Sequence, residues 1–312
     1  MANESSKREE LLEALQKKYD AIGQDLNIHL SGLLQQEPLT YWDYIQVDAL
    51  LGLQTKRTVF PDEMVFIMYH QINELIFKMI LWEIEQVSHN KALTTAFFTE
   101  RLLRISRYFD MLTTSFDIMT QGMEAEQYMK FRNSLAPASG FQSAQYRKIE
   151  FASTELINLI DARFRQTIDR NTSYEHALEH LYWQAAGKDH ETGKKTYLLT
   201  AFEKRYKDEF VAFTQEYNTI NLSAKFKSLP VEDQQNPDLI KAMRHYDYTV
   251  NITWVMAHYR TAAKYLNNGQ KEAAATGGSA WAKYMHPKYQ KRIFFPELWS
   301  EEERQNWGHD LQ

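Results

Sequence analysis

The sequence predicts an all-α fold, and three observations lead to this prediction. Its 312 residues include only 11 glycines and 7 prolines, where average usage would give about twenty and about fifteen, so tight turns are few. Apolar residues recur at helical spacing over long segments, and no segment of strand length alternates between apolar and polar residues. Hydrophobic residues make up 44% of the chain and aromatic residues 13%, which is enough for a large core. We expect a single-domain helical bundle over residues 1–312.

The predicted helices follow one another with short connections. The first, at residues 5–22, is highly charged with a narrow apolar stripe and is expected to be a surface helix or a helix that contacts a partner. Residues 1–40 are therefore interpreted as an N-terminal arm, in which a loop follows this helix. A proline and two acids at residues 61–63 predict the start of the longest helix, which runs to about residue 87. Further helices are expected at residues 95–121, 125–135, 139–165, 174–186, 194–217 and 238–266, with an aromatic segment at 41–54, a polar connector at 231–236 and a lid-like loop at 267–279.

Composition excludes several classes of function. The chain has no cysteine, which rules out disulfides, thiolate metal sites, iron–sulfur clusters and cysteine nucleophiles. A net charge of −5 offers no basic excess for phosphates, so we expect no nucleic-acid partner. The polar N-terminus has no apolar targeting segment, and no later segment approaches the roughly eighteen apolar residues of a membrane span. These features predict a cytoplasmic protein with no membrane contact.

The run FRNSLAPASGFQS breaks an otherwise helical sequence and places one arginine beside the break. Pro137 cannot continue a helix, and Ser139 with Gln142 has the spacing of an N-cap with a capping box. Arg132 then lies in the last turns of one helix, while free backbone N–H groups near Ser139 and Gly140 open the next. Both could bind one anionic group. The alternative is an ordinary helix–helix corner with a solvated arginine.

A histidine lies among aromatic residues on one face of the longest predicted helix. Phe66, His70, Asn73 and Phe77 are spaced so that they share this face. A histidine held in an apolar pocket stays neutral at pH 7 and can hydrogen-bond a substrate or a bound oxygen. The alternative is a core histidine with a structural role.

A second histidine lies on the last long helix. Trp254 and His258 are one turn apart, and the small residues Ala257, Ala262 and Ala263 would let a bulky group approach the helix surface. One imidazole on a rigid helix suits a proximal haem ligand. The alternative is a helix packed through its alanines, with an incidental histidine.

The segment HALEH contains a short zinc-peptidase-like pattern. His176 and His180 stand one turn apart, with Glu179 between them. No third ligand is evident, so a polar helix face is the favoured interpretation and a metal site is the alternative.

Four blocks together resemble the tryptophan 2,3-dioxygenase family, a group of all-helical haem enzymes. TYWDYIQVDALLGLQ at residues 40–54 resembles its early aromatic block, and DEMVFIMYHQINELIFKMILWEIE at 62–85 resembles its distal-histidine helix. FRNSLAPASGFQSAQYR at 131–147 resembles its arginine block, the most specific of the four. WVMAHYRTAAKYL, with the ATGGS motif before residue 280, resembles its proximal-histidine helix and loop.

The resemblance implies a haem b enzyme that uses O₂ to cleave the indole C2–C3 bond of L-tryptophan, giving N-formylkynurenine. His258 would be the axial iron ligand, His70 the distal histidine and Arg132 the ligand of the substrate carboxylate. The resemblance also implies a homotetramer, a dimer of dimers, in which one subunit reaches into its neighbour's site. The other implied residues are Thr276 over the substrate amino acid group, Ser139, Gly140 and Trp254 around the haem, Phe66, Tyr128 and Leu135 around the indole, and Tyr41, Tyr44 and Ile45 in the shared site.

Several positions depart from the family pattern. Pro61 stands in place of a histidine, Ile76 in place of a tryptophan, Tyr128 in place of a phenylalanine and Ala275 in place of a glycine. The loop at 259–275 is also longer than usual. These departures leave two alternatives open: a monooxygenase acting on tryptophan or a substituted indole, and a non-catalytic haem-binding or scaffold relative.

Overall fold

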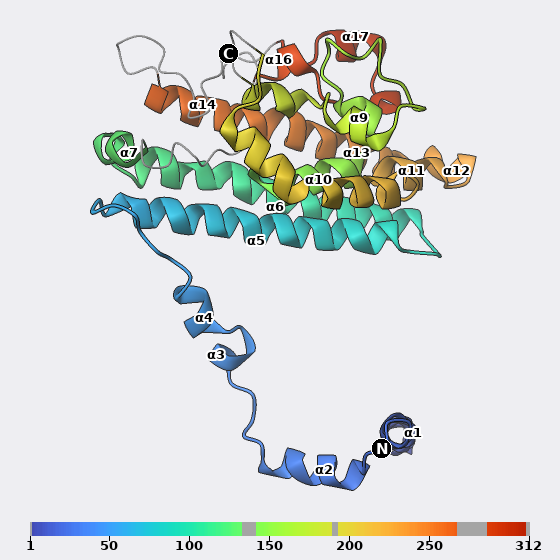
Figure 1. Ribbon diagram of the computed structural model, residues 1–312. Coiled ribbons are helices and arrows are strands. Elements are labelled where there is room, and N and C mark those ends of the chain that lie inside the picture. Colours follow the sequence, from blue (N-terminus) through green and yellow to red (C-terminus); the bar gives the residue numbers. More distant parts are fainter. Residues whose placement is uncertain (1, 133–141, 189–192, 267–285, 310–312) are drawn as a thin grey trace. The chain divides into compact units, whose positions relative to one another are not determined.

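The computed structural model describes residues 2–132, 142–188, 193–266 and 286–309 (Figure 1). Contacts divide the chain into two units, Met1–Gln54 and Thr55–Gln312. Within the described ranges every named element is an α, 3-10 or π helix, and the only extended pairing there consists of two isolated bridges. The all-α prediction is confirmed.

Residues 2–54 of the first unit form four helices. They are α1 (Ala2–Asp20), α2 (Leu26–Gln35), α3 (Tyr41–Tyr44) and α4 (Val47–Leu51). Helix α1 confirms the first predicted helix, and the loop expected after it is present at residues 21–25, before α2. The Asp25 carboxylate accepts a hydrogen bond from the N–H of Asn27 and caps α2.

The core of the second unit is built on two long neighbouring helices. Helix α5 (Asp62–Ser88) packs against α6 (Thr95–Gln121) and α8 (Ala144–Ser153), and α6 also packs against α13 (Pro237–Tyr248) and α14 (Trp254–Leu266) (Figure 1). Smaller elements complete the unit: α7 (Ala125–Arg132), η3 (Leu156–Leu159), α9 (Tyr174–Leu178), η4 (Tyr182–Gly187), α10 (Tyr197–Tyr217), α11 (Leu222–Lys227), α12 (Val231–Gln234), η5 (Thr249–Thr253), α16 (Pro287–Gln290), η6 (Pro296–Leu298) and α17 (Glu301–Gln305).

Helix α5 contradicts the prediction that no segment is apolar enough to span a membrane. By length and composition, this helix is apolar enough to cross a membrane. In its most apolar 18-residue stretch, 22% is buried. Core helices of soluble proteins meet the same criterion. Helix α5 carries two buried carboxylates, Glu63 and Glu83, and Glu83 forms ion pairs with Arg101 and Arg104 of α6. Through these ion pairs and its packing on α6 and α8, one face of helix α5 forms part of the core.

The helix predicted at residues 139–165 is wrong in both its limits. Helix α8 begins at Ala144, where the Ser143 hydroxyl accepts a hydrogen bond from the N–H of Tyr146, and it ends at Ser153. The predicted cap, Ser139, lies outside the described residues. The helix predicted at 174–186 is likewise shorter, ending at Leu178 before a 3-10 helix. The connector at 231–236 contains the short helix α12.

The helix predicted at 238–266 is interrupted by one π-helical turn. This turn, η5, lies between α13 and α14, directly before Trp254. Its residue Asn251 donates a hydrogen bond from Nδ2 to Oδ1 of Asp247, 2.8 Å away. A π turn inserts one residue into the helical register and therefore rotates the face that follows. The direction of Trp254 and of the residues after it depends on this turn.

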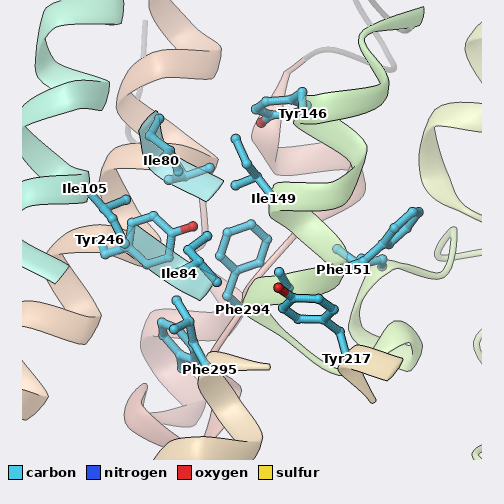
Figure 2. Packing of buried hydrophobic residues seen from close by; sticks show 14 of the residues in the cluster. Ile80, Ile84, Ile105, Tyr146, Ile149, Phe151, Tyr217, Tyr246, Phe294 and Phe295 are labelled. Atoms are coloured by element: carbon cyan, nitrogen blue, oxygen red, sulfur yellow. The ribbon is translucent and has the colours of Figure 1, made fainter. Parts of the chain in front are cut away.

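Buried aromatic residues join the last segment of the chain to the core. Tyr246 of α13 packs against Phe294 and Phe295, near Ile149 of α8 (Figure 2). Asp247, which is fully buried, accepts hydrogen bonds from the backbone N–H groups of both phenylalanines. It also accepts one from the indole N–H of Trp299. One carboxylate thus organises the C-terminal segment.

We expect Asp247 to make stability depend on pH. Burial raises the pKa of this carboxyl to about 6, against an ordinary value of 3.8. Between these values the folded chain binds the proton more tightly than the unfolded chain, so this group's contribution to the free energy of unfolding falls as pH rises from about 4 to about 6. The loss is on the order of 2–3 kcal/mol. Urea unfolding of the wild type and of Asp247→Asn at several pH values measures it, and equal pH slopes for the two proteins would contradict the assignment.

Candidate functional site

His70 lies on α5 with its imidazole held by the helix itself. Its Nδ1 is 2.7 Å from the carbonyl oxygen of Phe66, and because a carbonyl oxygen only accepts hydrogen bonds, Nδ1 carries the hydrogen. The ring keeps exposed surface, yet the surrounding protein lowers the pKa of His70 through desolvation. The Phe66 ring packs against it at a centroid distance of 4.1 Å. In this neutral tautomer, Nε2 is a hydrogen-bond acceptor.

His258 lies on α14 between aromatic rings. It stacks on Phe116 of α6 at a centroid distance of 5.5 Å and contacts Trp254 at 5.8 Å. Burial, followed by the charge of His70, lowers the pKa of His258 to about 4. The two imidazoles are therefore within electrostatic reach of each other, and both are neutral at pH 7.

Arg132 and Tyr128 form a polar pair on α7. Arg132 is buried, and its positive charge acts on the Tyr128 hydroxyl. Burial raises the pKa of Tyr128, so its hydroxyl stays protonated. Since a guanidinium only donates hydrogen bonds, the hydrogen of the hydroxyl remains available for another group. The pair presents a cation and an O–H donor side by side.

Aromatic side chains connect this pair to the two histidines. Phe66 lies 6.0 Å from Tyr128 and 5.8 Å from Phe131, measured between ring centroids. The ring of Tyr265 packs on Tyr128 at 4.6 Å. Helix α7 and the end of α14 accordingly meet at the end of the bundle where α5 begins (Figure 1). Phe66, His70, Tyr128, Arg132, Trp254 and His258 gather there.

Other predicted site residues cannot be placed with this group. Leu135, Ser139, Gly140 and Thr276 lie outside the described residues. Tyr41, Tyr44 and Ile45 belong to the first unit, where their side chains are exposed. Their assigned roles remain predictions.

A sequence model described as tryptophan 2,3-dioxygenase matches residues 31–264. The chain belongs to the tryptophan 2,3-dioxygenase family. Curated relatives of that name include one from Bacillus thuringiensis subsp. konkukian (strain 97-27), 29% identical over 282 residues, and one from Geobacillus thermodenitrificans (strain NG80-2), 28% identical over 283 residues. Both alignments cover 85% of this chain and 92% of the relative. A third, from Ruegeria sp. (strain TM1040), is 40% identical over 118 residues, 37% of this chain and 41% of the relative. These matches confirm the resemblance and the prediction of a haem-dependent dioxygenase-type oxidoreductase.

The tryptophan 2,3-dioxygenase family implies a haem, and the surroundings of His258 fit one. The imidazole makes no hydrogen bond to any described residue, and its lowered pKa leaves a lone pair free for a metal ion. The stack on Phe116 fixes the ring plane, and the half-buried Ala257 beside it is small. A neutral, oriented imidazole of this kind is the donor that haem iron takes.

Tyr128 is the departure from the tryptophan 2,3-dioxygenase pattern that the structure explains best. A buried hydroxyl needs a polar partner, and the Arg132 guanidinium acts on it electrostatically. Ile76 is buried in the main core and Pro61 precedes the first residue of α5, so both have structural roles. Ala275 lies outside the described residues.

Phe116 and Tyr265 contact the candidate site although sequence reasoning did not select them. Phe116 lies one turn after Leu112, which is the spacing of any buried helix face. This spacing is the same for a core residue and for a ring that stacks on a ligand histidine. Tyr265 lies just before the loop and carries no motif. Only the tertiary contact identifies them.

The HALEH segment is engaged in structural contacts. Glu179 accepts a hydrogen bond from Lys207 at 2.7 Å, and Nδ1 of His180 donates to the carbonyl of His176 at 2.9 Å. Among the described residues there is no group of three or more histidines and acids placed to hold a metal ion. The contacts favour the polar-face interpretation.

Proposed function

We propose that this chain is a haem b enzyme that converts L-tryptophan and O₂ to N-formylkynurenine. The reaction breaks the indole C2–C3 bond and places one oxygen atom on each carbon. The observation that carries the proposal is the meeting of four groups at one end of the bundle: two neutral imidazoles, His70 and His258, and the paired Arg132 and Tyr128.

His258 would hold the haem iron, and Trp254, Ser139 and Gly140 would bind the rest of the haem. The haem iron supplies the binding and activation of O₂. The aromatic side chains Phe116 and Trp254 orient the imidazole, so the ligand position is fixed before haem arrives.

Arg132 and Tyr128 would hold the substrate carboxylate. The guanidinium and the phenolic O–H can each donate to one carboxylate oxygen, and hydrogen bonds to a charged group contribute about 1.5–3 kcal/mol each. Thr276 would close over the amino acid group, while Phe66 and Leu135 would bury the indole. This arrangement fixes the direction of the ring relative to the reacting oxygen.

His70 would orient the indole through its N–H. Because Nδ1 donates to the Phe66 carbonyl, Nε2 is free to accept a hydrogen bond from the indole nitrogen. The role is positioning of a proton at the indole nitrogen, without transfer of that proton to the histidine.

The decisive experiment is a single product analysis. Haem-loaded protein is reduced without oxygen, then given L-tryptophan and isotopically labelled O₂, and the product is weighed by mass spectrometry. A gain of two labelled oxygen atoms is expected. A gain of one would indicate a monooxygenase, and no product from protein with a normal haem spectrum would indicate another substrate or a non-catalytic relative.

Removal of the Tyr128 hydroxyl tests the carboxylate site. In Tyr128→Phe, loss of one hydrogen bond to a charged group, worth about 1.5–3 kcal/mol, should raise KM for L-tryptophan roughly ten- to hundredfold while haem binding is unchanged. Steady-state kinetics measures this change. Tyr197→Phe, which removes a hydroxyl from an exposed tyrosine of α10, is the matched control. Equal KM values in the two variants would contradict the role.

The proposed homotetramer is supported by an exposed apolar stripe on α5. Its residues are spaced 4, 3, 4 and 3 apart, as in the contact seam of a coiled coil. They are Met68, Ile72, Leu75, Met79 and Trp82. Tyr41, Tyr44 and Ile45 would contribute to the neighbouring subunit's site. We place this assembly in the cytoplasm.

The oligomer predicts a specific effect of charge on the stripe. Leu75→Glu should lower the mass in solution from that of a tetramer to that of a smaller species, because a carboxylate would be buried at the seam. Light scattering coupled to size-exclusion chromatography measures the mass. Lys204→Glu, on the exposed side of α10, should leave it unchanged, and a monomeric wild type would contradict the assembly.

A further inference from the structure

A second concave site lies on the C-terminal part of the chain and shares no residue with the candidate functional site. It is an open pocket of about 440 Å³ formed by η3, α17 and the segment between α16 and η6. Pockets that hold small molecules span about 300–1,000 Å³. Its size therefore suits a small organic ligand.

Three cations and one acid line the pocket. The cations are Arg165, Lys291 and Arg304, and the acid is Glu301. Arg304 pairs with Glu301, whereas Arg165 and Lys291 form no ion pair within the described ranges. The pocket therefore carries two positive charges that no carboxylate in contact neutralises, and this excess favours an anion.

The two unpaired cations are held in place by carbonyl groups. Arg165 donates from Nε to the carbonyl of Ile160 at 3.0 Å and from Nη2 to that of Gln290 at 2.8 Å. Lys291 donates from Nζ to the carbonyl of Gln305 at 2.7 Å. Carbonyl oxygens orient a cation without cancelling its charge. These contacts reduce the entropy that each side chain would lose on binding a ligand.

Arg304 adds a buried donor to the same wall. Its Nε is buried without a hydrogen-bond partner among the described residues, and a buried donor of this kind normally has one. Because this atom has no exposed surface, a ligand in the pocket would meet the other part of the Arg304 side chain, which is 40% exposed.

The rest of the pocket wall consists of three apolar residues and two amides, Asn158 and Gln305. Ile157, Ile293 and Pro296 line it, and Ile293 is itself buried in a cluster with Trp307. A simple inorganic anion would leave this surface in contact with water. A ligand with both a carboxylate and an apolar group would use both parts of the wall.

We propose that the pocket formed by Arg165, Lys291, Arg304 and the apolar wall of Ile157 and Ile293 binds a small organic carboxylate that carries an apolar group. It is a second ligand site, separate from the site of Arg132. It does not depend on the function proposed above.

Calorimetric titration of the full-length, haem-loaded protein tests the proposal. Phenylacetate is the probe, with acetate and inorganic phosphate compared at constant ionic strength, and all three are titrated into Arg132→Ala so that the other carboxylate site does not contribute. We expect saturable binding of phenylacetate at least tenfold tighter than that of acetate or phosphate. Absence of saturable binding, or equal affinity for phosphate, would overturn the proposal.

Two variants in the same background assign the binding to this pocket. Arg165→Gln should weaken phenylacetate binding about tenfold. Lys291→Gly should also weaken phenylacetate binding. Loss of folding would not explain that result, because Lys291 has a φ of 45°, which glycine adopts more readily than lysine. Arg170→Gln removes an exposed arginine paired with Glu155 and serves as the matched control. Unchanged affinity in both pocket variants would refute the site.

Discussion

His258→Ala is expected to abolish haem binding. The imidazole is the axial donor in the proposed site, and alanine offers no atom that can coordinate iron. The variant, supplied with haem and freed of excess, should lack the Soret absorbance of the wild type. Its helical circular dichroism should be unchanged, because His258 makes no hydrogen bond to any described residue and its main contacts are ring contacts with Phe116 and Trp254.

His70→Ala is the matched control for this prediction. It removes the other imidazole of the site, which among the described residues donates to the Phe66 carbonyl, and it should retain the Soret absorbance while turnover falls. Full haem binding by His258→Ala would exclude the ligand assignment. Loss of haem from His70→Ala alone would assign the axial role to His70 instead.

The long helices could be predicted from the sequence because their signals are local. Helix α5 starts at a proline followed by two acids, and α6 and α10 each begin after a threonine whose hydroxyl caps the first turn. The end of α8 has no local signal. There the Ser153 hydroxyl hydrogen-bonds Tyr246 and the Thr154 hydroxyl donates to the carbonyl of Phe294. Partners 93 and 140 residues away end this helix, and no pattern near residue 153 indicates them.

The candidate site was predictable where two residues share one helix face. His70 with Phe66, and His258 with Trp254, are one turn apart, so their spacing alone places each pair together. Contacts between helices were not predictable in this way. Neither the stack of His258 on Phe116 nor the π turn before Trp254 follows from local spacing, since both depend on how α6 and α13 pack. The resemblance to the family supplied the link between the two histidines, and their electrostatic interaction supports it.

Arg132→Ala is expected to raise KM for L-tryptophan by roughly ten- to hundredfold. The guanidinium would provide the only full positive charge assigned to the substrate carboxylate, and a hydrogen bond to a charged group contributes about 1.5–3 kcal/mol. If substrate binding is at equilibrium, the lost binding free energy raises KM. The value of kcat falls only to the extent that the bound indole is displaced from its reactive position. Steady-state kinetics of the haem-loaded variant, with the Soret band as a check on haem content, separates the two parameters.

Arg132→Lys distinguishes charge from geometry. Lysine keeps the positive charge but lacks the planar fork that binds the Tyr128 hydroxyl and a carboxylate together. We expect it to recover part of the lost affinity and to leave KM above the wild-type value. Indole derivatives without a carboxylate should show no difference among the wild type, Arg132→Lys and Arg132→Ala. An unaltered KM for L-tryptophan in Arg132→Ala would remove the arginine from the substrate site and leave its pairing with Tyr128 as a purely structural contact.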